Sequence, residues 1–209
     1  MTEASPMAMF PLGMVLLPSM IVPLHVFEPR YRAMTKDCLD GDRQFGVALI
    51  ERGSEVGGGD VRSDAGTAAT IVAAEEFPDG RWRLVIAGTR RIRIDRWLPD
   101  DPYPRAEVRD WPDASPADGD VADSLAAVAA RTRQVLALQS ELGGPGPPID
   151  FELADDPAVA QWQLASMAPA GPWDRQRLLT AETGAQRLEL LAELLSDAEE
   201  LIRARIEMG

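Results

Sequence analysis

The stretch Leu17–Arg32, LPSMIVPLHVFEPRYR, decides how the first half of this chain folds. Its apolar part is interrupted by two prolines, Pro18 and Pro23, and its charged part begins at Glu28. Proline breaks a helix interior and cannot donate to a β ladder, so the apolar part is predicted to be a strand at a sheet edge, bend or strand start. Pro29 fits the first turn of a helix, so the charged part predicts a helix that begins there.

The same stretch overlaps the longest apolar run, residues 9–27, which is long enough to cross a bilayer. Its prolines and Gly13 would break a spanning helix repeatedly, and no basic residue precedes it as one would in an export signal. The single cysteine, Cys38, cannot form an internal disulfide, which suits a reducing compartment. A cytoplasmic location is therefore expected, with no membrane partner.

Charge is distributed unevenly along the 209 residues, whose formal net charge is −13. Residues 1–112 hold 17 acids and 14 bases, whereas residues 113–209 hold 17 acids and 7 bases. Binding to nucleic acid or to an anionic membrane needs a basic excess that neither part has. Nucleic acid is therefore not expected as a partner.

Few residues of the types that carry out chemistry are present. One histidine, His25, and one cysteine, Cys38, cannot supply a zinc site of three or four such ligands, and no calcium-loop or phosphate-loop spacing occurs. No metal and no cofactor are therefore expected. His25 has apolar neighbours and is predicted to be structural, with ligand contact as the main alternative to catalysis. Cys38 lies near the C-terminal end of the predicted helix, where the dipole disfavours a thiolate, so it is predicted to be a small buried residue.

Residues 1–112 show the pattern of a β-rich subdomain. Short apolar or alternating runs predict strands over residues 7–12, 21–27, 44–51, 66–77, 81–89, 90–98 and 103–111. The glycine-rich segment 53–66 is predicted to be a loop, and Asp79-Gly80 a hairpin turn. The inserted helix is predicted to end at Gly41 and to bury one face, formed by Tyr31, Met34, Cys38 and Leu39. Many short antiparallel strands favour a small barrel or folded sheet.

Residues 113–120, DASPADGD, are predicted to be a linker, and residues 121–209 a helical subdomain. Periodicity and proline positions predict helices over residues 121–142, 156–167, 172–180 and 184–207. The last helix carries an apolar seam that is predicted to pack against more than one neighbour; it consists of Leu188, Leu191, Leu195, Ala198 and Ile202, widened by Leu190, Leu194 and Leu201. The fold class expected from both halves is α+β.

Several patches of sequence, spread over nearly the whole chain, occur together in one known family. The most specific is HVFEPRYR, residues 25–32. The others are Phe10-Pro11-Leu12, Leu17-Pro18, Val22-Pro23-Leu24, Gly66-Thr67-Ala68, Asp79-Gly80-Arg81, Gly88-Thr89-Arg90-Arg91 with Ile92 and Ile94, and, near the end, Gln176, Leu178-Leu179 and Arg187-Leu188 with Leu191, Leu194 and Leu195. Together they resemble the N-terminal substrate-binding domain of Lon proteases, and HVFEPRYR is especially similar to its stand-alone bacterial and RING-associated members.

The resemblance implies a PUA-like antiparallel β pseudo-barrel with one inserted helix, followed by a C-terminal helical bundle. In full-length Lon proteases this domain helps to recognise unfolded or tagged protein substrates and supports the hexamer. No Walker A segment occurs in this sequence, and nothing around the only lysine, Lys36, resembles the Ser–Lys dyad of the Lon protease domain. A substrate-binding domain without a motor or a protease is therefore expected, and not an enzyme.

The function expected on this basis is non-catalytic binding of exposed or extended segments of client proteins. The alternative is a regulatory scaffold or adaptor that binds one specific folded partner, such as a protease or an ATPase. The peptide-binding residues are predicted to lie in a groove between barrel and bundle; they are Met20, Val22, Leu24, Phe27 and Trp97. The identity of the client and the oligomeric state are left open by the sequence.

An arginine series on the mid-chain strands admits three interpretations. Strand alternation favours a solvated face whose arginines pair with nearby acids such as Glu75, Glu76 and Asp95. Docking to the acidic helical half and contact with RNA are the alternatives. The series consists of Arg81, Arg83, Arg90, Arg91, Arg93 and Arg96.

Overall fold

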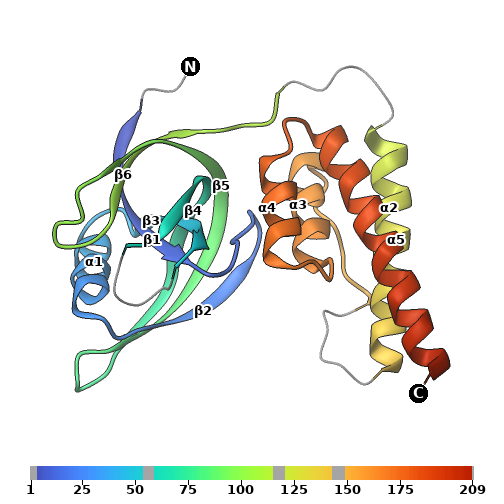
Figure 1. Cartoon of the computed structure of the whole chain (residues 1–209), viewed down its shortest axis with the longest axis horizontal. Coiled ribbons are helices and arrows are strands. Elements are labelled where there is room, and N and C mark those ends of the chain that lie inside the picture. The colour runs from blue at the N-terminus through green and yellow to red at the C-terminus, as the bar shows by residue number, and fades with distance from the viewer. Residues whose placement is uncertain (1–3, 54–58, 115–120, 143–148, 209) are drawn as a thin grey trace. The chain divides into compact units, whose positions relative to one another are not determined.

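The structure of the protein, a computed structural model, describes residues 4–53, 59–114, 121–142 and 149–208. The chain divides into two compact units, Met1–Pro112 (unit 1) and Asp113–Gly209 (unit 2), and each is described by itself (Figure 1). Of the predicted linker 113–120, residues 115–120 lie outside the described residues.

Unit 1 is a six-stranded mixed sheet with one helix. Its elements are β1 (Ser5–Leu12), β2 (Ile21–Val26), α1 (Pro29–Asp40), β3 (Gln44–Arg52), β4 (Val61–Glu76), β5 (Trp82–Leu98) and β6 (Arg105–Asp110). The strand order is β2-β5-β4-β3-β1-β6, and β6 pairs with β5 as well (Figure 1). The sheet is therefore partly closed, with β2 joined to it along β5 alone, and with unit 2 the fold class is α+β as predicted.

The sheet departs from the predicted strands in three ways. β1 and β3 pair in parallel, which is possible because β2 and α1 lie between them and form the long crossover that parallel strands need. Residues 81–89 and 90–98 are not two strands but parts of one unbroken strand, β5. The first half of β5 pairs with β2 and β4, and its second half pairs with β4 and β6. β4 begins at Val61, so the predicted loop 53–66 is a strand at its end, while residues 54–58 lie outside the described residues.

α1 closes one side of the main core of unit 1. It begins at Pro29 and ends at Gly41, whose N–H donates to the Asp37 carbonyl (3.1 Å), as the sequence predicts. Tyr31, Met34 and Cys38 are buried in the same apolar cluster as residues of β1 to β5, and Leu39 packs against it. The Tyr31 ring stacks on the Phe10 ring with centroids 4.1 Å apart, which ties the start of the helix to β1.

The entry to β2 is held tightly against β5. The Ser19 N–H donates to the Gly88 carbonyl and the Gly88 N–H donates to the Met20 carbonyl, both at 2.9 Å. A Cβ on Gly88 would overlap the carbonyl oxygen of Leu17, so this close approach of two backbones requires glycine. The predicted hairpin at Asp79-Gly80 joins β4 to β5, with the Gly80 N–H bonded to the Phe77 carbonyl (2.8 Å).

Unit 2 consists of α2 (Val121–Glu141), α3 (Pro157–Met167), α4 (Pro172–Thr180) and α5 (Gly184–Met208). α5 packs against the other three helices, as its wide apolar seam predicts. Leu188, Leu191 and Leu195 are buried, whereas Leu201 is 73% exposed, so its predicted place in the seam is wrong. The packed part of the seam ends before the last turns of α5, because Leu201 points to solvent.

The only arginine that is fully buried in the described parts of the chain, Arg187, lies in unit 2. Its guanidinium donates to both carboxylate oxygens of Asp113 (2.7 and 2.5 Å) and to the Gln161 side chain (3.2 Å). Its Nε donates to the Leu178 carbonyl (3.3 Å), and the Trp162 ring lies 3.6 Å from the guanidinium carbon. Every face of the cation therefore has a partner, as burial of a charge requires.

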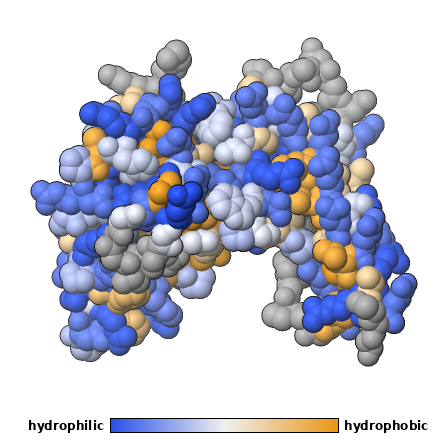
Figure 2. All heavy atoms as spheres, in the orientation of Figure 1, coloured by the Kyte–Doolittle hydropathy of each residue, from blue (hydrophilic) through white to orange (hydrophobic). Residues whose placement is uncertain are grey.

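The surface offers no extended apolar area in the view of Figure 2. Hydrophilic residues cover most of that face and hydrophobic ones form small separate patches (Figure 2). In the described parts of the chain, every helix is too short or too polar to traverse a bilayer.

Candidate functional site

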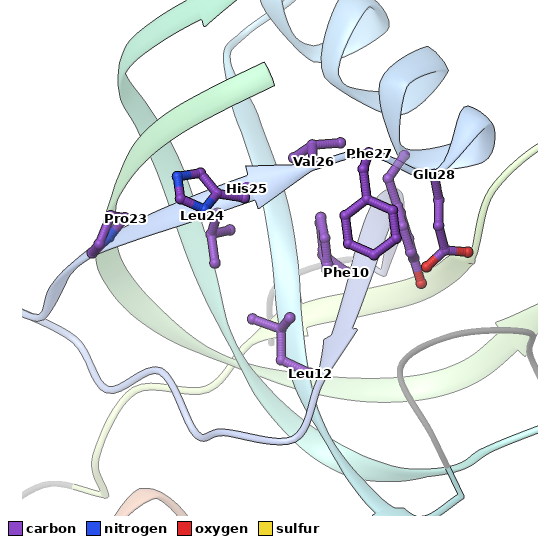
Figure 3. A pocket seen from close by; sticks show the side chains of 9 residues that line it. Phe10, Leu12, Pro23, Leu24, His25, Val26, Phe27 and Glu28 are labelled. Atoms are coloured by element: carbon purple, nitrogen blue, oxygen red, sulfur yellow. The ribbon is translucent and has the colours of Figure 1, made fainter. Parts of the chain in front are cut away.

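The candidate site is a pocket of about 180 Å³ beside β2, called here the β2 pocket (Figure 3). It is lined by Phe10, Leu12, Pro23, Leu24, His25, Val26, Phe27, Glu28 and Tyr31. β1 supplies one wall, β2 and the turn after it supply the other, and the first turn of α1 closes one end. In Figure 3 the Leu12 and Leu24 side chains point toward one another from these two walls.

The local sequence explains why the pocket is apolar inside and open at one side. Alternation along β2 directs Leu24 and Val26 to the interior, while Pro23 and His25 lie on the outer face. The turn after β2 then exposes Phe27, which is 55% accessible and lines the pocket together with Phe10 (Figure 3). An exposed aromatic ring at the mouth of an apolar pocket is suited to bind an apolar side chain of a partner.

Two titratable side chains of the pocket, Tyr31 and Glu28, are affected by burial and by an ion pair, respectively. Burial raises the pKa of the Tyr31 phenol to about 12, so this side chain is neutral and not a general base at ordinary pH. The Glu28 carboxylate at the rim is paired with the Arg30 guanidinium (3.1 Å). The pocket can therefore bind an uncharged group, and its side chains do not form an acid–base or nucleophilic set.

The structure brings together some of the predicted site residues. Leu24 and Phe27 line the β2 pocket, and Met20 and Val22, on and just before the same strand, pack against the core cluster behind it. Trp97 is separate: it pairs with β6, packs against a second cluster, and lies under the Arg62 guanidinium at 4.8 Å. The predicted groove between the two subdomains stays a prediction.

The predicted peptide-binding set contains Leu24 and Phe27 and lacks the other seven residues of the pocket, which are Phe10, Leu12, Pro23, His25, Val26, Glu28 and Tyr31. Phe10 and Leu12 belong to a predicted apolar strand and to the family resemblance, but their closeness to β2 depends on the path of the sheet. Tyr31 belongs to the predicted buried face of the helix that starts at Pro29, and that helix follows directly on the turn that holds Phe27.

The candidate catalytic residues are not assembled into a site. His25 is exposed on the outer face of β2, where its backbone pairs with that of Arg83, and its predicted structural role stays a prediction. Cys38 is buried, its Sγ donates to the Gln44 carbonyl (3.3 Å), and burial, with Asp42 and Asp37 nearby, raises the pKa of the thiol to about 12. Such a thiol is a poor nucleophile, as predicted.

The remaining candidates are engaged in surface contacts. Lys36 pairs with Glu76 (3.4 Å). A second, more polar pocket of about 300 Å³ is lined in part by Cys38, and its polar groups bond to one another: the Tyr103 hydroxyl donates to Asp37 (2.8 Å) and Arg90 donates to Gln44 (2.8 Å). The described residues contain no group of three possible metal ligands.

Four of the six arginines of the series form surface ion pairs, Arg91 is buried, and the exposed Arg93 has its guanidinium carbon 5.1 Å from the centroid of the Trp111 ring. The surface ion pairs, at 2.5 to 2.7 Å, are Arg81–Asp79, Arg83–Glu75, Arg90–Asp110 and Arg96–Glu107. Of the acids named as partners only Glu75 serves the series, because Asp95 pairs with Arg109 and Glu76 with Lys36. Arg91 is buried and not solvated, since its Nε donates to the Trp111 carbonyl (3.1 Å) and its guanidinium lies 4.5 Å from the Trp111 ring.

The comparison with known families agrees with the residue pattern around the pocket. The model of the ATP-dependent protease La (LON) substrate-binding domain matches residues 6–197. The chain belongs to the Lon substrate-binding domain family. The matched range includes the whole sheet of unit 1 and most of the helices of unit 2, so the β2 pocket lies within the family domain.

Lon proteases of several bacteria match most of this chain. Lon protease 1 of Herpetosiphon aurantiacus is 28% identical over 195 residues, which are 88% of this chain and 23% of that protein. The Lon protease of Cytophaga hutchinsonii is 25% identical over 204 residues, which are 94% of this chain and 24% of that protein. The chain therefore spans about a quarter of the length of these curated relatives.

Solved structures confirm that the fold is that of a Lon N-terminal domain. The crystal structure of a Lon N-terminal domain protein from Xanthomonas campestris has a TM-score of 0.65 at 28% identity, covering 90% of this chain and 98% of that one. The N-terminal domain of the Mycobacterium avium complex Lon protease has a TM-score of 0.69 at 18% identity, covering 92% and 99%. The second likeness shows the fold alone.

Proposed function

We propose that this Lon-family domain binds polypeptide without acting on it chemically, and that its ligands are exposed or extended segments of client proteins. The β2 pocket carries the proposal. It is apolar, it has a half-exposed phenylalanine at its mouth, and it lies in a family whose domain is named for substrate binding. Binding takes place in the cytoplasm and needs no cofactor.

The contact residues are proposed to centre on β2. Leu24 and Phe27 would touch the client directly, whereas Met20 and Val22 support the strand from behind. Trp97 is proposed as a further contact residue in a separate part of unit 1. In fold terms, we propose that the partly closed sheet is a PUA-like pseudo-barrel and that the helices of unit 2 form a bundle.

The test compares one client in two states. Reduced, carboxymethylated lactalbumin stays unfolded, and native lactalbumin is its folded counterpart. The protein is expected to bind the unfolded form more tightly, and a Phe27→Asp variant is expected to lose that preference, whereas Val72→Asp, at an equally exposed residue of β4, is not. Binding to both forms at background level would show the proposal to be wrong.

The alternative is a scaffold that binds one folded partner, such as a protease or an ATPase. It is favoured by two large apolar side chains on the helices of unit 2, Trp173 (61% exposed) and Leu201 (73% exposed), since exposed aromatic and aliphatic groups are typical of protein interfaces. Pull-down from the native host with mass spectrometry separates the two. One stoichiometric partner that is lost in Trp173→Ser or Leu201→Ser supports the scaffold, whereas many proteins that are lost in Phe27→Ser support client binding.

A further inference from the structure

β2 has one open edge. It pairs with β5 alone, at the end of the strand order. The Gly88 N–H of the β5 strand donates to the Met20 carbonyl (2.9 Å), and successive residues of a strand direct their backbone polar groups to alternate edges. The even-numbered residues of β2 therefore bond to β5, and the polar groups of Ile21, Pro23 and His25 are directed to the other edge. That edge meets no strand in the parts of the chain that the structure describes.

Pro23 agrees with this assignment. It has no N–H, so it can occupy β2 without loss of a ladder bond only if its nitrogen is directed away from β5. The open edge thus offers the N–H groups of Ile21 and His25 and the carbonyl groups of all three residues. Such a row of unpaired groups is the pattern that another extended chain recognises.

The open edge and the β2 pocket are parts of one surface. Pro23 to Glu28 line the pocket with Phe10 and Leu12 of β1 on the facing wall (Figure 3). A strand added to β2 would alternate its side chains, with one set toward the pocket and the other over the outer face, where Ile21 is 70% exposed. The open edge of β2 and the β2 pocket are therefore suited to the same kind of ligand, an extended chain with an apolar residue at alternate positions.

We propose that an extended apolar segment of a client adds to β2 as a further strand and places one side chain in the β2 pocket. This inference rests on the proposed function and names its binding mode. The Glu28 carboxylate at the pocket is already paired with Arg30, so the guest side chain in the pocket is proposed to be uncharged. A pocket of about 180 Å³ holds a single large side chain, since an apolar cavity of about 150 Å³ takes up benzene.

The experiment uses a fluorescein-labelled seven-residue peptide of alternating leucine and threonine, with blocked ends, and measures anisotropy. Two further peptides carry N-methyl groups, on every leucine in one and on every threonine in the other. Residues of one kind donate their N–H groups to one edge of the strand only. Strand addition therefore predicts that one methylated peptide binds like the parent and that the other binds at least about tenfold more weakly, because several backbone bonds are lost.

The peptide that retains binding also reports the strand direction. In an antiparallel pair, the guest residues that donate their N–H groups to β2 have side chains on the outer face, as Ile21 does. The alternate guest residues, the leucines, place their side chains in the pocket and direct their N–H groups away from β2. Methylation of leucine is therefore tolerated in this orientation. In a parallel pair the tolerated peptide is the one methylated on threonine. Amide exchange provides a second readout, since the N–H groups of Ile21 and His25 should gain protection when the parent peptide binds.

Two protein variants locate the site. Phe27→Ser should weaken the parent peptide about tenfold, as expected for one lost aromatic contact, whereas Val72→Ser should change binding by less than about twofold. Val72 is similarly exposed but lies on β4, separated from β2 by β5.

Each other outcome has a distinct meaning. If both methylated peptides bind as the parent does, apolar capture survives and strand addition is overturned. If unfolded lactalbumin binds but the parent peptide does not, strand addition is likewise overturned. If neither binds above background, the proposed function fails and the inference fails with it.

Discussion

Arg187 in unit 2 and the open edge of β2 in unit 1 differ in whether their polar groups have hydrogen-bond partners. The Arg187 side chain is 0% exposed and bonds to Asp113, Gln161 and a backbone carbonyl, under the Trp162 ring. The β2 edge leaves backbone donors and acceptors beside an apolar pocket that is open to solvent. Both regions contain strong hydrogen-bonding groups, but only the Arg187 guanidinium has its hydrogen bonds satisfied within its own unit.

The difference separates a structural polar group from an available one. A buried cation whose bonds are satisfied internally fixes one packing of the helices and has nothing to offer a ligand. An unpaired strand edge adds little to the stability of its own unit, but it can form bonds with an incoming chain. The comparison therefore predicts large stability effects around Arg187 and small ones along the outer edge of β2.

The largest effect is expected from Arg187→Ala. It removes the buried guanidinium with its hydrogen bonds to Asp113 and Gln161 and opens a cavity under Trp162, so the free energy of unfolding should fall by about 3–5 kcal/mol. The measurement is urea unfolding followed by the helical circular dichroism signal. Arg203→Ala is the matched control on α5, because its guanidinium is about half exposed and the loss of its pair with Glu199 should lower stability far less than Arg187→Ala does. Equal losses in both variants would contradict the contrast.

Gly88→Ala should come next, because it tests the paired side of β2. The new Cβ overlaps the Leu17 carbonyl, and relief of that overlap should cost about 1–3 kcal/mol and displace the start of β2. Unfolding followed by tryptophan fluorescence measures the loss, and binding of the leucine–threonine peptide should weaken with it. Gly171→Ala, where a Cβ meets open space, is expected to cost under about 1 kcal/mol.

Alkaline unfolding tests whether Tyr31, at the end of the β2 pocket that α1 closes, is shielded from water. The phenol of Tyr31 has an ordinary pKa of 10.0 and a pKa of about 12 in the folded chain, so the folded state holds the proton more tightly. Its contribution to stability is complete below pH 10 and is lost as the pH rises toward 12. The slope can reach about 1.4 kcal/mol per pH unit. Tyr31→Phe keeps the stacked ring and should flatten the decline in urea midpoints between pH 9 and 11; an unchanged slope would mean that the phenol is hydrated.

The smallest stability effect is expected from Pro23→Thr, which restores an N–H to the open edge. Stability should change by under about 1 kcal/mol, because the restored group faces away from β5. The added donor contributes about 0.5–1.5 kcal/mol to any strand that pairs there, so self-association should rise with concentration in sedimentation velocity. Pro78→Thr, at an exposed turn position, should not associate. Absence of association in both would place the β2 edge out of reach of a second chain.

The local elements could be predicted because local signals specify them. Pro29 begins α1, Gly41 ends it, Asp79-Gly80 turns β4 into β5, and the helices of unit 2 begin at or next to the predicted residues. The errors lie where distant pairing overrides the pattern. Arg91 is buried by Trp111, although alternation predicts solvent, because the sheet brings the end of β6 beside it.

The candidate site was half visible in the sequence. Leu24 and Phe27 follow from the alternation of one strand and the turn after it. Phe10 and Leu12 belong to another strand, and nothing in their spacing indicates that β1 faces β2 across a pocket. The open edge itself could not be predicted, since an edge is defined by which strands pair and not by the strand alone.

The sequence by itself determined the family, the α+β class, the helices and most of the strands, because prolines, glycines and apolar periods act over a few residues. Only the tertiary structure decided that Arg187 is saturated by partners from other parts of unit 2 and that β2 keeps one edge open. Burial and pairing are properties of residues distant in sequence, so the same LPSMIVPLHVFEPRYR stretch becomes a candidate binding edge only once β5 occupies its other side.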